Sequence, residues 1–364
     1  MRTLRVALHL AVITSFYLFA IALALGTEAA GVWLFGYSRH LPGRAALAGF
    51  LAGFIVMAVG WVLIYSLWPR SVRFKAPGPE LYASQHKQLF RELSRIAAFA
   101  GVKEVDHVYL LPAADLWVRE TSGFLGIGRK RVMGIGLLVL NVLTVSELRA
   151  VLAHEMGHFL AGDSRLGLWL FRARGAAEQT LTKLVEAGEL IDNAFAEWLI
   201  FLVSRPFVWF LPFYLKLSRS QMRHQELNAD QLAVRLEGTE PFCSGLSQVI
   251  RAHCVFPTYV AETLAPALAT GHLPPLGQSF RAFFTSPEGQ ALASLGLTAE
   301  RLSVAHPLDT HPPFSERFTH ARKLSIPARS KDDRLSIELL ADVGTMEKVL
   351  AKDWPRAKPA KAAA

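Results

Sequence analysis

Two long uncharged stretches near the N-terminus constrain the fold of this 364-residue chain more than any other feature. They cover residues 6–25 and residues 45–68, and neither contains Asp, Glu, Lys or Arg. A helix of about 20 residues crosses the roughly 30 Å hydrocarbon layer of a bilayer. Buried core helices are the alternative, but stretches of this length without a charge favour membrane spans. We therefore predict a transmembrane helical hairpin over residues 1–70.

The charges around the hairpin predict its orientation. Basic residues lie outside its two ends: Arg2, Arg5, Arg70, Arg73 and Lys75. The loop between the stretches holds Arg39 and Arg44, and cytoplasmic flanks carry the excess of Lys and Arg. A signal peptide is the alternative for the first stretch, but its length and the second stretch that follows favour an uncleaved hairpin. The prediction is a multi-pass protein of the inner cell membrane with the rest of the chain in the cytoplasm.

The pentad His154-Glu155-Met156-Gly157-His158 carries the clearest chemical signal. Thr144 and Glu147 have the spacing of a capping box, and the apolar residues after them recur at helical intervals, so the pentad is predicted to lie on a helix. Side chains four residues apart share one face of a helix, so both imidazoles can bind one zinc ion while Glu155 acts on a water molecule. The alternative is a buried helix that carries two histidines for packing.

A catalytic zinc ion commonly has three protein ligands and one open position. Glu226 is the candidate third ligand, on a helix predicted from about Gln221 to Leu236. Asp230 lies one turn further along and can accept the remaining N–H of a zinc-bound histidine. A solvated acidic helix face is the alternative for this pair, and the pentad makes the metal site the better interpretation.

These residues resemble the membrane-associated zinc metallopeptidase family of HtpX and the type I CAAX prenyl proteases. Four segments carry the resemblance: residues 147–153 leading into the pentad, Gly162-Asp163, Arg223-His224-Gln225-Glu226 with Ala229-Asp230, and Thr310-His311-Pro312-Pro313 with Arg317. The resemblance extends from about residue 74 to residue 324. It implies a mainly α, zincin-like (gluzincin) catalytic domain with a small β-sheet, attached to the hairpin.

The resemblance also implies roles for individual residues. His154, His158 and Glu226 would bind one Zn²⁺ ion, and Glu155 would be the catalytic base. Supporting positions are implied for Asp163, Asp230 and Arg317. The resemblance makes His311 a second catalytic residue that stabilises the oxyanion, whereas the Thr-His-Pro-Pro segment by itself indicates a turn that opens a helix.

The predicted function is that of a membrane-anchored, zinc-dependent endopeptidase. Its partners would be polypeptide substrates, including unfolded or membrane proteins, and the lipid bilayer; membrane-protein quality control, prenylated-peptide cleavage and processing of a single partner all fit the same site. Two other classes stay open, a non-catalytic membrane scaffold with chaperone-like binding and a signalling protease-sensor. Residues 26–44 leave little room for a sensory domain. The sequence makes no prediction of the oligomeric state.

Residues 195–217 form a third apolar stretch, which contains Glu197, Arg205, Pro206 and Pro212. His158 and Glu226 must meet at one metal ion, so the chain between them crosses the membrane an even number of times. The segment at 166–171 is too short for a partner crossing. We therefore expect 195–217 to be a Pro-broken helical element at the membrane interface or against the domain, although relatives with a further hairpin in this region keep a four-span topology open.

Two β-prone segments, 105–111 and 132–140, predict a small sheet beside the pentad. An exposed edge strand there would bind an extended polypeptide through main-chain hydrogen bonds. The alternative is that 132–140 is a buried strand without a binding partner, because it is apolar at nearly every position. An amphipathic helix is expected from Gln85 to about Gly101.

Composition agrees with this organisation. The net charge of +9 suits anionic lipid, and no basic helix or aromatic platform indicates nucleic-acid binding. Cys243 and Cys254 form no metal-type pair, which favours a reducing compartment without disulfides. The predicted domains are the hairpin to residue 70, a peptidase domain over 71–330, and a C-terminal helix with a partly disordered basic tail over 331–364.

Overall fold

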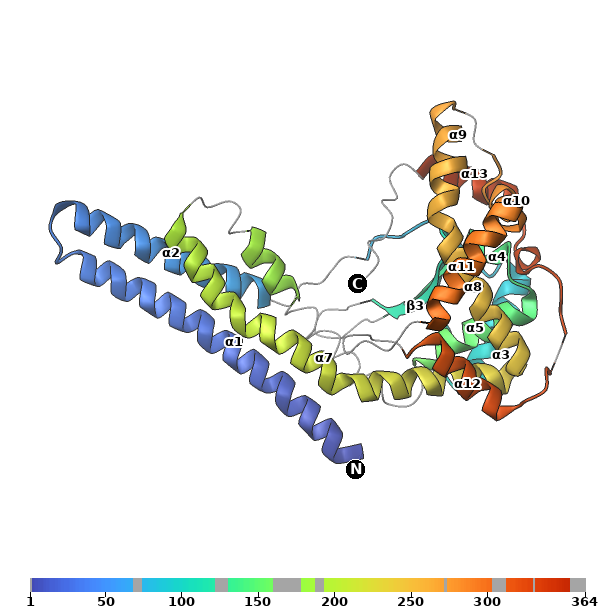
Figure 1. Ribbon diagram of the computed structural model, residues 1–364, viewed down its shortest axis with the longest axis horizontal. Helices are drawn as coiled ribbons and strands as arrows, with labels where there is room; N and C mark the ends of the chain where they lie inside the picture. Colours follow the sequence, from blue (N-terminus) through green and yellow to red (C-terminus); the bar gives the residue numbers. More distant parts are fainter. Residues whose placement is uncertain are drawn as a thin grey trace. The chain divides into compact units, whose positions relative to one another are not determined.

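The computed structural model describes residues 2–67, 74–121, 130–159, 178–186, 193–271, 274–302, 312–329 and 331–353. In these residues the chain is mainly helical with one small sheet, as predicted (Figure 1). The strands are β1 (Glu80–Leu81), β2 (His107–Leu111), β3 (Leu116–Glu120) and β4 (Arg131–Gly136). The helices are α1 (Arg2–Ser38), α2 (Gly43–Leu67), α3 (Lys87–Ala100), α4 (Leu137–Leu140), α5 (Val145–Gly157), α7 (Ala194–Glu237), α8 (Thr239–Tyr259), α9 (Ala265–Ala269), α10 (Leu276–Thr285), α11 (Pro287–Leu302), α12 (Phe314–Leu324) and α13 (Val343–Asp353). Residues 178–186 are also helical, Val260–Leu264 is a π-helix and Ser336–Leu339 is a 3-10 helix.

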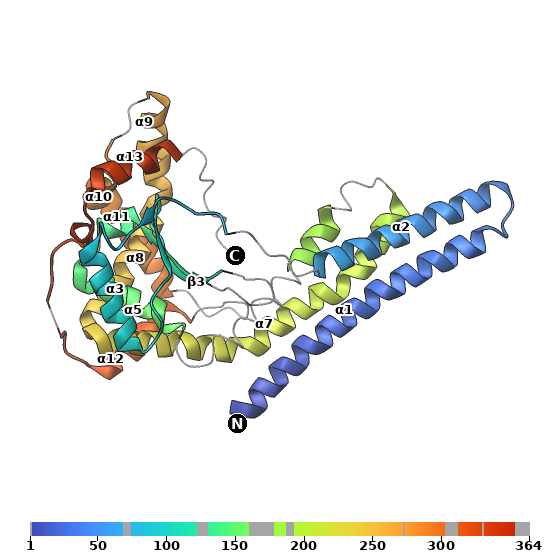
Figure 2. The ribbon, with the colours of Figure 1, turned by 180° about the vertical axis from the view of Figure 1, so that it is seen from behind.

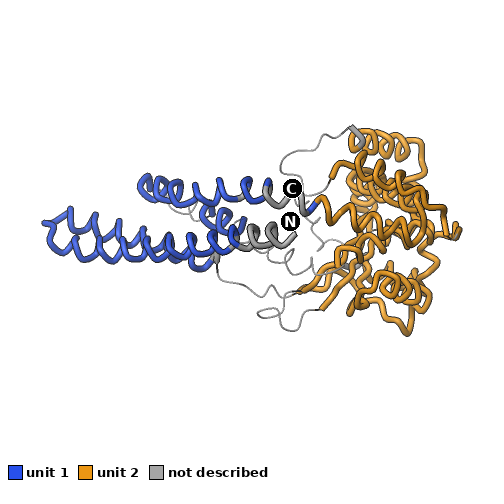
Figure 3. The backbone as a smooth tube through the Cα atoms, turned by 90° about the horizontal axis from the view of Figure 1, so that it is seen from below, with its two compact units in different colours: residues 1–70, 162–222, 306–310 blue, residues 71–161, 223–305, 311–364 orange. Residues whose placement is uncertain are grey.

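Contacts divide the chain into two compact units (Figure 3). Unit 1 contains residues 1–70, 162–222 and 306–310, and unit 2 contains residues 71–161, 223–305 and 311–364. The domain limits at residues 70 and 330 stay a prediction.

Glycine allows the two helices of the hairpin in unit 1 to pack closely. A Cβ on Gly53 would lie 3.1 Å from the carbonyl oxygen of Gly31, and a Cβ on Gly31 would clash with the side chain of Met57. An apolar core then joins α1, α2, residues 178–186 and α7 through Phe16, Ala20, Ala24, Val56, Val59, Leu63, Leu184, Leu199, Ile200, Val203 and Phe207.

Among the described residues, three helices are long and apolar enough to cross a membrane: Thr14–Ser38, Gly43–Tyr65 and Ala194–Tyr214. The first ends further along the chain than the stretch at 6–25, because α1 continues without a break to Ser38. Thr27 does not interrupt it, since its hydroxyl donates to the carbonyl oxygen of Ala24 at 2.7 Å.

Helix α7 contradicts the expected Pro-broken element at 195–217. It is continuous over 44 residues, with Pro206 and Pro212 inside it. Each proline removes one backbone hydrogen bond at a cost of about 3 kcal/mol. Val203 and Phe207 are buried in the core of unit 1 on either side of Pro206, and this packing offsets that cost. The predicted helix at about 221–236 is therefore the second half of a much longer helix.

The sheet of unit 2 has the strand order β1-β2-β4-β3. Strands β2 and β4 are parallel, with Tyr109 opposite Gly134, and β3 is antiparallel to β4. The expected strand at 132–140 is correct as far as Gly136, after which the chain turns into the short helix α4. Strand β3 was not predicted.

The helices of unit 2 gather on one side of the sheet (Figure 2). Helix α5 is central, because it contacts α3, α8 and β3 and is buried along nearly its whole length. Helix α3 begins at Lys87 and ends before Gly101, whose φ of 65° is the left-handed conformation that glycine adopts readily. Cys243 and Cys254 are free thiols, and burial raises the pKa of Cys243 to about 11.

Candidate metal centre and active site

Helix α5 presents the pentad at its C-terminal end. The N-terminus of the helix has the predicted capping box, in which Thr144 Oγ1 accepts the N–H of Glu147 at 3.2 Å and the Glu147 carboxylate accepts the N–H of Thr144 at 2.8 Å. The hydroxyl of Ser244 on α8 also donates to Glu147. His158 follows Gly157 as the C-cap of α5 and keeps a helical conformation, so the two imidazoles lie one turn apart on the same face.

A close contact between α5 and α7 brings the second motif to the pentad. A Cβ on Gly157 would lie 2.8 Å from the Cα of Ala229 and 3.0 Å from its Cβ. Glycine at this position and alanine opposite it therefore let the two backbones approach. The contact lies between Glu226 and Asp230 on α7, which places both carboxylates beside the histidines.

Three metal-ligating side chains converge in unit 2. His154 Nε2 lies 3.6 Å from Glu226 Oε2, and His158 Nε2 lies 3.7 Å from Glu226 Oε1. The donor atoms of these three residues are all within 4.8 Å of one another, and no other group of three such residues was found among the described parts of the chain. His154 and Glu226 are buried, whereas His158 is half-buried.

Asp230 and Arg317 form the support behind these donors. The Nδ1 atom of His154 lies 2.9 Å from Asp230 Oδ1, so the carboxylate can fix the ring while Nε2 faces Glu226. Arg317, on α12, donates to both oxygens of Asp230, at 2.9 Å from Nε and 2.6 Å from Nη2. Its Nη2 also lies 3.3 Å from each ring nitrogen of His154, and its Nη1 lies 3.8 Å from Glu226.

Opposite charges decide the protonation states of this support. Burial alone would raise the pKa of Asp230, but Arg317 and His154 outweigh it, and the pKa lies below its ordinary value. Burial would likewise lower the pKa of Arg317, yet Asp230 and the nearby glutamates raise it. Asp230 is therefore a carboxylate and Arg317 a guanidinium cation, which makes their pair a charged, two-point contact.

Glu155 lies between the histidines and strand β3. Burial raises the pKa of its carboxyl, and Glu226 acts in the same direction, whereas His154, a hydrogen bond from the backbone N–H of Val118 and Arg317 oppose the rise. A carboxyl with a raised pKa holds a proton more readily than an exposed one, which suits a group that accepts and returns protons.

Strand β3 is an edge of the sheet. The backbone N–H and C=O groups of its successive residues point alternately toward β4 and away from it. The N–H of Thr121 donates to Lys130 at 2.8 Å, and the N–H of Gly136 donates to Asp115 at 2.7 Å, so the odd-numbered residues pair with β4. The even-numbered residues Leu116, Val118 and Glu120 point their backbone groups to the other side. Val118 faces Glu155 for this reason.

Two predicted site residues, His311 and Asp163, lie outside the described residues. The structure brings together the other six: His154, Glu155, His158, Glu226, Asp230 and Arg317. Sequence reasoning missed Val118, whose contact with Glu155 is made by the backbone. The β-prone run from Leu116 to Val118 was the signal that could have indicated an edge strand here.

The donor set fits zinc. Two imidazole nitrogens and one carboxylate are the ligands of a known class of catalytic zinc site that leaves a fourth position open. Ligand atoms about 2.0–2.1 Å from a tetrahedral ion are about 3.3 Å apart. The separations of 3.6 and 3.7 Å between the histidines and Glu226 are close to this value, and the three donor atoms all lie within 4.8 Å of one another.

Comparisons with known proteins identify the family of the chain and two similar relatives. The family model described as "Peptidase family M48" matches residues 83–325, which is more than half of the chain. The chain is similar to "Protease HtpX" of Aliivibrio fischeri (strain MJ11), with 25% identity over 224 residues, 55% of this chain and 74% of the relative. "Protease HtpX" of Aliivibrio fischeri (strain ATCC 700601 / ES114) matches with the same values. No solved structure matches the chain.

Proposed function

Because the chain belongs to peptidase family M48 and is a metallopeptidase with apolar helices suited to a membrane, we propose that it is a zinc-dependent endopeptidase anchored in the bilayer. One observation carries this proposal: two imidazoles from one helical turn and a carboxylate from a distant helix converge on a common position.

In this proposal, His154, His158 and Glu226 hold one Zn²⁺ ion. When bound, zinc would supply a Lewis acid that polarises a peptide carbonyl and lowers the pKa of water toward about 7. Asp230 holds the His154 ring in one orientation, and Arg317 holds Asp230. Both contacts are charge-assisted, and partners of this kind commonly contribute 10- to 100-fold to metal affinity.

Glu155 is proposed as the general base and general acid. Its carboxylate takes a proton from the attacking water and returns it to the leaving amine. Its place beside His154 and its hydrogen bond from the backbone N–H of Val118 support this role, because both hold the carboxyl next to the proposed metal position. His311 is proposed to stabilise the negative charge on the carbonyl oxygen, a contribution that is typically a few kcal/mol.

The edge of β3 is proposed to bind the substrate as an added strand. The N–H groups of Leu116 and Val118 donate to the carboxylates of Asp115 and Glu155, so their outward carbonyl oxygens are the groups offered to an extended chain. Main-chain hydrogen bonds of this kind recognise a polypeptide with little regard to its sequence. Such binding suits unfolded polypeptides and membrane proteins as substrates, and a role in membrane-protein quality control.

We propose a multi-pass topology in the inner cell membrane with unit 2 in the cytoplasm. The charge bias around α1 and α2 supports this orientation. Ala194–Tyr214 shares an apolar core with both helices of the hairpin, which supports its membership of the membrane unit. His158 and Glu226 belong to one site, so both must lie on the same side of the membrane. If Ala194–Tyr214 crosses the membrane, the chain must therefore cross it once more between residues 159 and 194.

Substitution of Glu155 by Gln tests the catalytic role. The amide keeps the size of the side chain but cannot accept the proton, so the variant should bind one zinc ion per chain and lose cleavage of unfolded protein by at least about 10²-fold. Zinc content would be measured by elemental analysis, and cleavage with a fluorescent unfolded casein in detergent or native membranes.

Glu104→Gln, which makes the same chemical change at an exposed residue outside the site, is the matched control and should cleave like the parent. A Glu155→Gln protein with parental activity would contradict the proposed base. A zinc-free parent that binds unfolded chains without cleaving them would favour the scaffold function instead.

A further inference from the structure

The C-terminal part of the chain contacts the N-terminal end of the helix that carries the pentad. Residues 331–340, which we call the C-terminal clasp, run past the first turn of α5, and Leu335 pairs with Thr144 in an isolated β-bridge. The clasp lies outside residues 83–325, the part that the family model matches. Family membership therefore does not account for it.

The clasp backbone supplies hydrogen bonds that a helix N-terminus lacks. The N–H of Val145 donates to the carbonyl oxygen of Arg334 at 2.9 Å, and the N–H of Ser146 donates to that of Asp332 at 3.3 Å. In return, the N–H of Asp332 donates to Ser146 Oγ at 2.9 Å. Together with the capping box, these contacts give each of the first three N–H groups of α5 an acceptor.

Buried side chains fasten the clasp to unit 2. Ser336 is fully buried, and it donates its hydroxyl to Leu140 at 3.0 Å and its N–H to Leu143 at 2.9 Å. Leu339 and Leu340 belong to the same apolar core as α5. The clasp is thus a built part of the domain that contains the candidate site.

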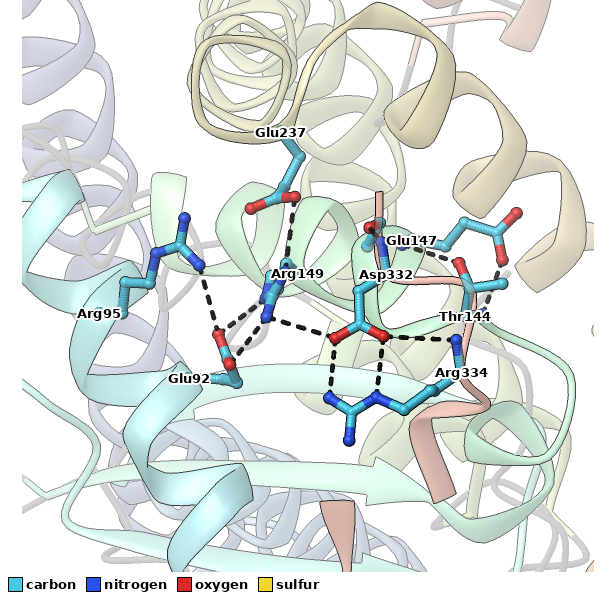
Figure 4. A network of polar contacts seen from close by, with 9 residues as sticks. Glu92, Arg95, Thr144, Glu147, Arg149, Glu237, Asp332 and Arg334 are labelled. Carbon is cyan, nitrogen blue, oxygen red and sulfur yellow. Dashed lines mark hydrogen bonds and ion pairs between the residues drawn. The ribbon is translucent and has the colours of Figure 1, made fainter. Parts of the chain in front are cut away.

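Asp332 links the clasp to a buried arginine on α5 (Figure 4). Its carboxylate accepts hydrogen bonds from Arg334 at 2.8 and 3.0 Å and lies 3.8 Å from Nη2 of Arg149. Arg149 also donates to Glu92 of α3 at 2.7 and 2.8 Å, and it lies 4.0 Å from Glu237 of α7. One side chain therefore connects the clasp, α3, α5 and α7.

The contact between Arg149 and Glu237 bears on the metal donors because α7 also carries Glu226. Eleven residues separate these two glutamates, which is about three helical turns, so they share a face of α7. Helices α5 and α7 therefore contact each other at two points, where Gly157 packs against Ala229 and where Arg149 lies beside Glu237. These two contacts align one helix with the other. A shift of α5 at the clasp would change the separation between its histidines and Glu226.

We propose that the C-terminal clasp is a positioning element for catalysis and that Asp332 is the positioning residue through which it acts. The clasp fixes the first turn of α5 and, through Arg149, the alignment of α5 with α7. This inference rests on the proposed function, since it takes His154, His158 and Glu226 as the metal ligands.

Two neighbouring charge reversals in the full-length protein provide the test. Asp332→Lys places an ammonium group beside Arg149 and Arg334 and expels the clasp. Asp333→Lys makes the same change in net charge at a side chain that is 69% exposed and pairs with Lys331. Asp332→Glu keeps the carboxylate and serves as the conservative rescue.

Two measurements would be made, steady-state cleavage of a fluorescent unfolded casein and the visible absorption of the protein loaded with Co²⁺ in place of zinc. A misplacement of about 1 Å can cost about 10²-fold in rate. Asp332→Lys should therefore lower kcat by about tenfold to a hundredfold, leave KM within about twofold and alter the cobalt spectrum. Asp333→Lys and Asp332→Glu should match the parent within about twofold.

Equal kcat values and identical cobalt spectra for Asp332→Lys and Asp333→Lys would overturn the proposal. A parent that binds Co²⁺ but cleaves nothing would refute the proposed function, while the cobalt spectra would still decide the role of the clasp. If Asp332→Lys does not fold, Asp332→Asn takes its place, and its kcat should fall by about threefold. A parental kcat and a parental cobalt spectrum for Asp332→Asn would then overturn the proposal.

Discussion

The buried carboxylate of Asp230 holds two groups that a metal site needs in fixed positions. It accepts two hydrogen bonds from Arg317 and lies 2.9 Å from Nδ1 of His154. Asp230→Asn keeps the size of the side chain but removes its charge, so the buried guanidinium loses its main partner and the ring loses a strong acceptor. We expect zinc affinity to fall by about 10- to 100-fold, as measured by competition with a chelator.

Asn228→Ala is the control for Asp230→Asn, because Asn228 is exposed on the same helix two residues away. It should bind zinc like the parent. Parental zinc affinity in Asp230→Asn would show that the orientation of His154 does not depend on this carboxylate.

Single residues differ in how far the sequence predicts their place. The four-residue spacing of His154 and His158 is read directly from the chain, because one helical turn fixes it. Val118 escaped prediction because its backbone, not its side chain, contacts Glu155. Any residue type offers a backbone N–H, so residue identity holds no signal of such a contact.

At the scale of elements, the approach of α5 to α7 depends on the absence of a side chain at Gly157. A Cβ there would lie 2.8 Å from the backbone of Ala229, which cannot move aside as a flexible side chain would. Gly157→Ala should therefore separate the histidines from Glu226. We expect a loss of zinc affinity of at least about tenfold, measured by chelator competition, and destabilisation by about 1–3 kcal/mol from overpacking.

Gly344→Ala in α13 is the matched control, since a Cβ at that helical glycine meets nothing within 4 Å. It should leave zinc binding unchanged and leave stability unchanged or slightly higher, by up to about 1 kcal/mol. If Gly157→Ala bound zinc as tightly as Gly344→Ala, the close approach would not be what assembles the site.

Elements also show where local patterns mislead. Residues 132–140 are apolar at nearly every position, a pattern that fits a buried strand and a buried helix equally well, and the chain changes from β4 to α4 within the run. Pro206 and Pro212 indicated a break, yet α7 continues through both. Burial of the neighbouring side chains decided this, and burial depends on residues of other helices.

For the whole molecule, the proposed orientation predicts which parts of the chain are accessible from outside an intact cell. In a protein with Cys243 and Cys254 replaced by Ser, Arg39→Cys places a thiol between α1 and α2, and Lys75→Cys places one after the hairpin. A membrane-impermeant maleimide should label Arg39→Cys in intact cells. It should label Lys75→Cys only after the cells are broken.

Labelling of the same two variants in broken cells controls for reactivity. The reverse pattern, with Lys75→Cys labelled from outside, would place unit 2 on the outer side of the membrane and overturn the proposed orientation. It would leave the metal site itself untouched, because all its described residues belong to unit 2.

The sequence by itself determined the features that depend on neighbours within one or two helical turns: the apolar helices, the capping box of α5 and the spacing of the pentad. Only the tertiary structure decided the contacts between distant residues. Arg317 meets Asp230 across 87 residues, and Asp332 meets Ser146 across 186. Such contacts form when the packing of the whole core brings their elements together, and spacing along the chain holds no record of that packing.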